Sequence, residues 1–130
     1  LTKFHESDMY PYVKFKFEKC ERGYSCKLCE QCTININGKM RRPDYIRYVE
    51  KNGKIEKIEV MEVKKDCSIK NDYIEQINEY GSMLKKNYNV PIKKVLVMPS
   101  RANLSNIPKD IEVEFIENVV CENGIPVLYK

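Results

Sequence analysis

An Asn-Gly pair between two strand-like segments constrains the fold of this chain more than any other feature. Asn52-Gly53 is a strong signal for a two-residue hairpin turn, because both residues tolerate the positive φ that such a turn requires. Residues 43–50 before the pair and 55–64 after it read as strands. We therefore expect an antiparallel hairpin that has residues 44 and 62 at its open end.

The segments outside the hairpin read as alternating helices and strands. Helical spacing of apolar side chains predicts helices at residues 5–19 and 69–88. Further strands are expected at residues 33–37, 93–98, 111–116 and 125–129. This order predicts an α/β domain with a central mixed β-sheet and helices on both faces. The helix after the hairpin would connect two parallel strands.

Length and composition indicate one domain over residues 1–130. A chain of 130 residues can form a single hydrophobic core but not two. No run approaches the roughly 18 apolar residues of a membrane span, so no membrane association is expected. No secretory signal is recognisable at the start, which favours a cytoplasmic location, including that of a viral protein acting in its host. The net charge of +4 is compatible with a polyanionic partner without requiring one.

Four of the six cysteines lie close together, at Cys20, Cys26, Cys29 and Cys32. In an intracellular protein such a cluster favours a metal site over a disulfide framework. Tetrahedral Zn²⁺ is the simplest occupant of this knuckle at residues 20–32. An iron–sulfur cluster, or free or disulfide-bonded cysteines, are the alternatives. The isolated Cys67 and Cys121 are expected to be plain buried residues.

Two acids and a lysine come together if the hairpin forms. Glu62 and Lys64 are two residues apart in a strand and share a face, and Asp44 would lie across from them. Two carboxylates can hold Mg²⁺ or Mn²⁺, which polarise a phosphate and lower the pKa of a bound water. A lysine beside them can position that water and offset charge on phosphorus. The arrangement predicts cleavage of phosphodiesters.

The motif Pro43-Asp44…Glu62-x-Lys64 resembles that of the PD-(D/E)xK nuclease superfamily. Gln76-x-x-x-Tyr80 on the next helix is similar to a pair found in its RecB-like branch, which includes CRISPR-associated and viral nucleases. The resemblance covers roughly residues 5–98 and implies a restriction-endonuclease-like core.

The same resemblance implies supporting roles for three more residues. Glu6, from the first helix, would complete the metal site, although Asp8 and Glu18 compete for this role. Gln76 and Tyr80 would orient the lysine or the strand being cut.

The resemblance also bears on the four clustered cysteines. In RecB-like nucleases that carry an iron–sulfur cluster, one cysteine precedes the core and three follow it. Here all four precede the core, which favours zinc.

Basic residues beside the site could contact a nucleic acid. Arg41 and Arg42 precede Asp44, and Lys65 follows Lys64. An ordinary solvated basic surface is the alternative interpretation. His5, the one histidine, is expected to be solvated.

The sequence thus favours a metal-dependent deoxyribonuclease. Whether it cuts DNA internally or from an end, and whether RNA is also cut, stays open. A homodimer is expected if both strands of a duplex are cut, because one site cuts one strand. The rival hypotheses are a non-catalytic, zinc-stabilised nucleic-acid-binding module and a subunit of a larger complex.

Overall fold

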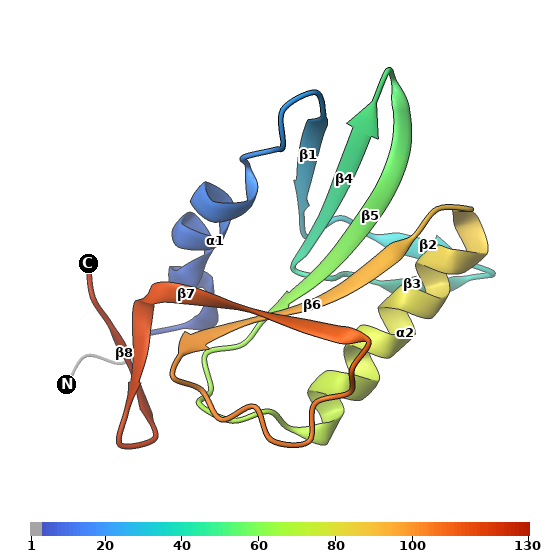
Figure 1. The fold of residues 1–130 in the computed structure, drawn as a ribbon. Helices are drawn as coiled ribbons and strands as arrows, with labels where there is room; N and C mark the ends of the chain where they lie inside the picture. Colours follow the sequence, from blue (N-terminus) through green and yellow to red (C-terminus); the bar gives the residue numbers. More distant parts are fainter. Residues whose placement is uncertain (1–3) are drawn as a thin grey trace.

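A six-stranded mixed β-sheet forms the centre of the computed structural model, which describes residues 4–130 (Figure 1). Its strands, in spatial order, are β1 (Ser25–Glu30), β4 (Tyr45–Lys51), β5 (Lys54–Val63), β6 (Ile92–Ser100), β7 (Ile111–Glu122) and β8 (Ile125–Leu128). β6 pairs parallel with β5 on one side and with β7 on the other. The pairs β1–β4, β4–β5 and β7–β8 are antiparallel. The predicted mixed sheet is confirmed.

The predicted hairpin is the pair β4–β5. Asn52 and Gly53 have φ angles of 52° and 77°, the left-handed conformation that a two-residue turn requires. Tyr45 pairs with Met61, so the next positions outward are those of Asp44 and Glu62. A second Asn-Gly turn joins β2 (Ile34–Ile36) to β3 (Lys39–Arg41), which form a small separate sheet.

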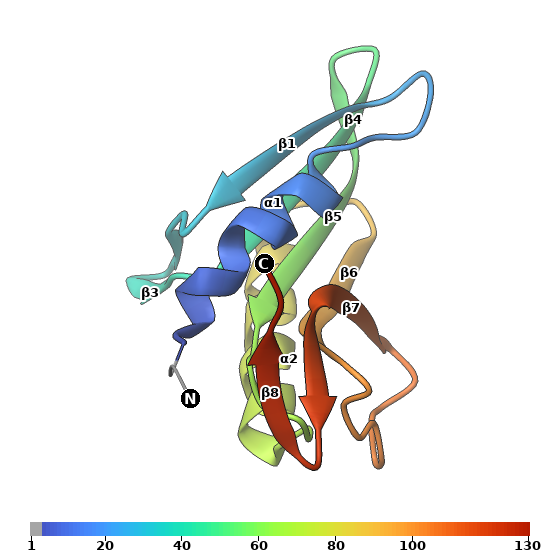
Figure 2. The same cartoon turned by 90° about the vertical axis from the view of Figure 1, so that its left-hand side faces the viewer.

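Helices cover both faces of the sheet, as predicted. A short 3-10 helix, η1 (Glu6–Met9), leads into α1 (Tyr10–Phe17) on one face, and α2 (Asn71–Asn87) lies on the other (Figures 1 and 2). Apolar side chains from alternate strand positions therefore form two cores, one under each helix. α2 connects β5 to its parallel neighbour β6. Among the residues that the structure describes, no helix has the length and apolar character needed to cross a bilayer.

Two strands are longer than the sequence predicts. β6 continues through Pro99 because the pairing with β7 shifts between Pro99 and Ser100, and such an irregularity tolerates a proline that cannot donate a hydrogen bond. β7 continues beyond residue 116 to Glu122, where it turns into the edge strand β8.

The predicted metal knuckle at residues 20–32 is not formed. Its four cysteines pair as two disulfides, Cys20–Cys26 and Cys29–Cys32. Cys26 and Cys29 both belong to β1 and are three residues apart, so their side chains leave the strand on opposite faces. Cys29 lies across from Ile46 and packs against the core under α2. The four sulfur atoms therefore do not converge on one point.

A third disulfide corrects the prediction that Cys67 and Cys121 are plain buried residues. It joins the segment after β5 to β7, with a Cα–Cα distance of 5.8 Å. The sequence could not predict this pair because Cys121 lies in the part of β7 that was not expected to be strand. Disulfides are typical of oxidising environments, so they hint at one, while the location of the protein stays a prediction.

The Cys67–Cys121 bridge should stabilise the fold more than either of the other disulfides. Its two cysteines are 54 residues apart in the sequence, and for a loop of this length chain entropy predicts a stabilisation of about 4 kcal/mol. The bridge between Cys29 and Cys32 has a separation of 3, which corresponds to about 2 kcal/mol. Urea unfolding of the two double serine variants measures both losses. Equal losses would contradict this expectation.

Candidate active site at the open end of the β4–β5 hairpin

The structure brings Asp44 and Glu62 together, and each carboxylate accepts a backbone hydrogen bond from the strand of the other residue. The backbone N–H of Asp44 donates to Glu62 Oε1 at 2.9 Å. The backbone N–H of Val63 donates to Asp44 Oδ2 at 2.7 Å. The register of β4 on β5 therefore holds both carboxylates directly, with backbone donors rather than flexible side chains.

Glu62 is buried and carries a strongly perturbed pKa. Only 4% of the residue is exposed. Burial, and then the charge of the Asp44 carboxylate, raise its pKa to about 8. At neutral pH Glu62 therefore holds a proton that a bound cation would have to displace.

Lys64 lies between Glu62 and an aromatic ring. Its Nζ atom is 3.8 Å from Glu62 Oε2 and 4.6 Å from the centroid of the Tyr73 ring. A cation over an aromatic face is attracted by the ring quadrupole. The Tyr73 hydroxyl donates to the Asp66 carboxylate, which ties this ring to the segment that follows β5. The lysine is thus held in place from two sides.

Tyr10 is a site residue that sequence reasoning missed. Its hydroxyl donates to Asp44 Oδ1 at 2.6 Å and accepts a hydrogen bond from Gln31 Nε2 at 3.3 Å. Burial and the hydrogen bond with Asp44 raise the pKa of this phenol, so it stays a donor at neutral pH. Tyr10 and Tyr73 both lie within helices that the sequence predicts, but no sequence signal marked the hydroxyl of Tyr10 or the contact between the Tyr73 ring and Lys64.

Glu6 lies beside the site rather than in contact with the acid pair. It belongs to η1, and its carboxylate accepts the backbone N–H of Lys65 at 3.0 Å. Asp8 and Glu18, the alternatives to Glu6, are both exposed. Asp8 accepts the backbone N–H of His5, which is also exposed. Across residues 4–130, no three His, Cys, Asp or Glu side chains gather closely enough to hold a metal ion. The acid pair is therefore a two-carboxylate site.

Gln76 and Tyr80 lie on one face of α2, as their spacing predicts. Gln76 Nε2 donates to the Tyr80 hydroxyl at 3.0 Å. Burial raises the pKa of Tyr80, and the charges of Glu62 and Asp44 add to this effect. The tyrosine is thus close enough to both acids to respond to their charge, while the amide contacts the tyrosine.

The three basic residues expected to contact nucleic acid have different surroundings. Arg41 is paired with Glu79 of α2, and Lys39 contacts the same carboxylate at 3.0 Å. Lys65 Nζ donates to a backbone carbonyl at 2.9 Å. Arg42 is exposed.

Comparisons with known proteins identify no relative of this chain. No protein-family model matches this chain, and no curated protein matches its sequence.

The acid pair should make stability depend on pH. Folding raises the pKa of Glu62 from an ordinary value near 4.5 to about 8. The protonated Glu62 therefore stabilises the fold fully below pH 4.5, and this stabilisation is lost as the pH rises through 8. A pKa unit corresponds to about 1.4 kcal/mol. Between pH 5 and 9, without divalent cations, the free energy of unfolding of wild type should fall by on the order of 4 kcal/mol more than that of Glu62→Gln. Urea unfolding across this range tests the expectation, and parallel stability curves would contradict it.

Proposed function

We propose that this protein is a metal-dependent deoxyribonuclease that uses Asp44, Glu62 and Lys64 to hydrolyse phosphodiester bonds. The observation that supports it most is the meeting of these side chains at one end of a hairpin. The two carboxylates accept backbone hydrogen bonds from Val63 and Asp44, and an ammonium group lies 3.8 Å from Glu62. A buried carboxyl group whose pKa is strongly raised by burial and by a neighbouring carboxylate is a candidate functional group.

The donor set suits a hard divalent cation. Mg²⁺ and Mn²⁺ prefer carboxylate oxygens and keep several waters, and such an ion, when bound, polarises a phosphate and acidifies a coordinated water. Asp44 would present its free lone pairs while Tyr10 and the Val63 N–H fix its orientation. Glu62 would lose the proton that its raised pKa retains at neutral pH.

Lys64 would act on the phosphate and the attacking water. Its side chain is 15% exposed, so it is partly shielded from solvent, which strengthens the effect of its charge on a developing negative charge. The Tyr73 ring would hold the ammonium group in this position. Gln76 and Tyr80 would line the wall on the side of α2, and Glu6 would stiffen the backbone just after Lys64.

Membership of the PD-(D/E)xK superfamily, as a RecB-like nuclease with a restriction-endonuclease-like core, is part of this proposal. It is supported by the succession of an antiparallel hairpin, a helix and a parallel strand around the acids. The placement of Gln76 and Tyr80 on the face of α2 near the acids supports it further.

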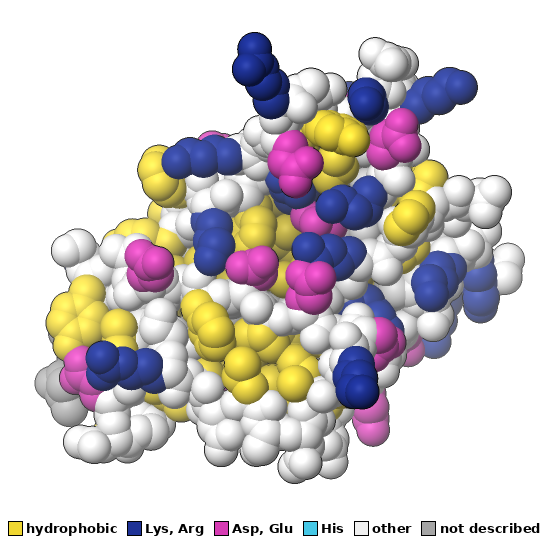
Figure 3. Space-filling model, in the orientation of Figure 1, with side chains coloured by type: hydrophobic (Ala, Val, Ile, Leu, Met, Phe, Trp, Pro, Cys, Tyr) yellow, Lys and Arg dark blue, Asp and Glu magenta, His cyan; other side chains and the backbone are white. Residues whose placement is uncertain are grey.

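DNA as the substrate rests on the chemistry of the site and on the basic residues beside it. Basic and acidic side chains are interspersed on the face that Figure 3 shows, so the net charge of +4 is not concentrated there in one continuous basic surface. Arg42, next to the acid pair, is exposed and would contact a phosphate near the scissile bond. A homodimer would be needed to cut both strands of a duplex at once.

Cleavage assays with single-stranded, linear and circular DNA test the proposal directly. Wild type with Mg²⁺ or Mn²⁺ should cut at least one of these substrates, and Lys64→Ala should lower kcat by about 100-fold or more. Lys54→Ala is the matched control, because this exposed lysine lies on the same strand at its far end. Circular dichroism would verify that each variant folds.

Equal rates for wild type, Lys64→Ala and Glu62→Ala would overturn the proposal. Salt-sensitive DNA binding without cleavage, unchanged by loss of Asp44 and Glu62, would favour a nucleic-acid-binding module instead.

Glu79 should limit the affinity for DNA. It neutralises two cations of the β2–β3 hairpin, Arg41 and Lys39, just before the chain reaches Asp44. Glu79→Gln should release both for phosphate contacts and tighten DNA binding about threefold at low salt. Fluorescence anisotropy in EDTA measures this, with Glu75→Gln, an exposed acid of the same helix, as the control. Unchanged affinity of Glu79→Gln would contradict the expectation.

A further inference from the structure

A disulfide closes the turn at the end of β1, next to the acid pair. Cys29 and Cys32 are joined with a Cα–Cα distance of 5.8 Å, so residues 29–32 form a tight turn. Gln31 is the third residue of this turn and has a φ of 52°. A positive φ at that position is usual for Gly or Asn, because larger side chains crowd their own backbone there. Gln31 is therefore an unusual residue for this conformation.

Gln31 contacts Asp44 in two ways. Its backbone N–H donates to the Asp44 carbonyl at 2.9 Å. Its side-chain Nε2 donates to the Tyr10 hydroxyl at 3.3 Å, and this hydroxyl in turn donates to Asp44 Oδ1 at 2.6 Å. One residue of the turn thus holds the backbone of Asp44 and, through Tyr10, its carboxylate. A glutamine can reach Tyr10 from this turn, whereas a glycine could not. An unusual backbone conformation beside a candidate site points to a role in that site.

Strand pairing ends at this turn. β1 ends at Glu30, so the hydrogen bond from Gln31 to Asp44 is the last one between this segment and β4. The chain next enters a strand at Ile34, where β2 begins in the separate small sheet. The ends of strands open more readily than their centres. The disulfide therefore adds a covalent cross-link at the point where backbone pairing is weakest.

The bridge between Cys29 and Cys32 is accessible to a reductant, because both residues are partly exposed. A dithiol reduces such a bridge by thiol–disulfide exchange. The S–S bond breaks, each cysteine sulfur gains one electron and one proton, and the dithiol closes into its own disulfide. The turn then loses its cross-link, and Gln31 is free to leave the left-handed conformation that its side chain disfavours.

We propose that the Cys29–Cys32 disulfide is a redox-sensitive clamp that positions Asp44 through Gln31, so that reduction of the bridge lowers the activity of the site. Gln31 is a positioning residue, because it acts on the Asp44 backbone and on Tyr10 rather than on reacting groups. The effect on catalysis rests on the proposed nuclease function. The effect on the geometry of Asp44 does not, and it is measured separately.

Hydrogen exchange in the metal-free protein tests the clamp without any assay of cleavage. Two amides report on Asp44: the Gln31 N–H bonded to its carbonyl, and the Val63 N–H bonded to its Oδ2 at 2.7 Å. In Cys29→Ser/Cys32→Ser both amides should exchange about tenfold faster than in wild type, because local opening no longer has to break the cross-link. If this variant does not fold, Cys32→Ser alone replaces it and leaves Cys29 in place.

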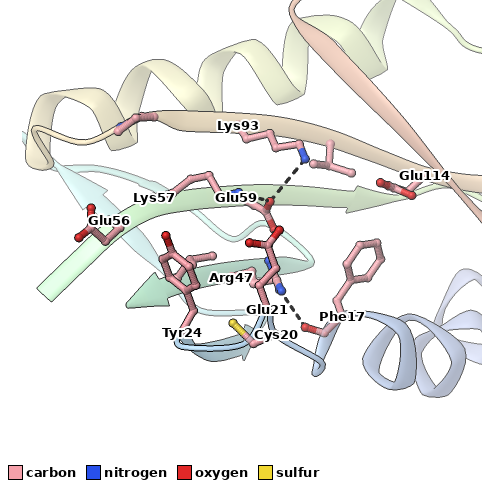
Figure 4. A pocket seen from close by; sticks show the side chains of 13 residues that line it. Phe17, Cys20, Glu21, Tyr24, Arg47, Glu56, Lys57, Glu59, Lys93 and Glu114 are labelled. Atoms are coloured by element: carbon pink, nitrogen blue, oxygen red, sulfur yellow. Dashed lines mark hydrogen bonds and ion pairs between the residues drawn. The ribbon is translucent and has the colours of Figure 1, made fainter. Parts of the chain in front are cut away.

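The Cys20–Cys26 disulfide provides the matched control. It also closes a short loop, with a sequence separation of 6, and Cys26 also belongs to β1. Cys26 lies across from Val49, which at about 3.4 Å per residue is about 17 Å along the strand from Asp44. Cys20 lies beside the cavity that Arg47 lines, away from the acid pair (Figure 4). Cys20→Ser/Cys26→Ser should therefore leave the exchange of both reporting amides unchanged.

Cleavage assays with Mg²⁺ test the effect on catalysis. Dithiothreitol should lower the kcat of oxidised wild type about tenfold and leave KM nearly unchanged, because a misplaced group affects the chemical step more than binding. Cys29→Ser/Cys32→Ser should show the lower kcat from the start and should not respond to dithiothreitol. Gln31→Gly, which suits the turn but cannot reach Tyr10, should lower kcat even with the bridge intact. Circular dichroism would verify that each variant folds.

Unchanged exchange of the two amides in Cys29→Ser/Cys32→Ser would overturn the clamp. Equal fold-losses of kcat on adding dithiothreitol to wild type and to this variant would overturn it as well, because the sensitivity would then belong to the other bridges. If oxidised wild type cuts no DNA, the nuclease proposal fails, while hydrogen exchange still decides whether the bridge positions Asp44.

Discussion

The register of β4 on β5 is the constraint on which the rest of the structure depends. A slip of one residue would move every side chain of a strand to the other face of the sheet. The Asn52-Gly53 turn and a one-residue shift in the pairing between Val49 and Glu50 together fix the register, and the pairing beyond the shift sets Asp44 beside Glu62 at the open end. The same pairing sets Arg47 across from Glu59 on the other face. One hairpin thus builds two charged groups on opposite faces of the sheet, the acid pair and the Arg47–Glu59 ion pair.

Two glutamates of β5 show how partners decide the effect of burial. Glu59 and Glu62 are 5% and 4% exposed, and burial raises the pKa of both. At Glu59 the hydrogen bond and charge of Arg47, with the lysines nearby, outweigh burial and lower the pKa. At Glu62 the nearest charge is another carboxylate, so the pKa rises. The first glutamate is a stable ionic partner within the sheet, and the second retains its proton at neutral pH.

The cysteines show where reasoning from spacing fails. Four cysteines within thirteen residues suggested one metal knuckle, but spacing alone does not say which way side chains point. Because β1 extends over Cys26 and Cys29, strand geometry separates them to opposite faces. The partner of Cys67 was beyond reach of local patterns, since Cys121 is 54 residues away and comes close only after β5, β6 and β7 have assembled.

The sequence by itself missed β1 and β3, and it determined the Asn52-Gly53 turn, most of the other helices and strands, and the placement of Glu62 and Lys64 on one face of β5. These follow from interactions between residues close in the chain: turn preference, alternation along a strand and helical period. Only the tertiary structure decided that Tyr10 donates to Asp44, that Tyr73 packs on Lys64, and that Glu6 holds the backbone of Lys65. These contacts join separate elements, and their geometry depends on how helices pack on the sheet. No local pattern of residues encodes that packing, because it is set by the sum of many weak contacts across the core.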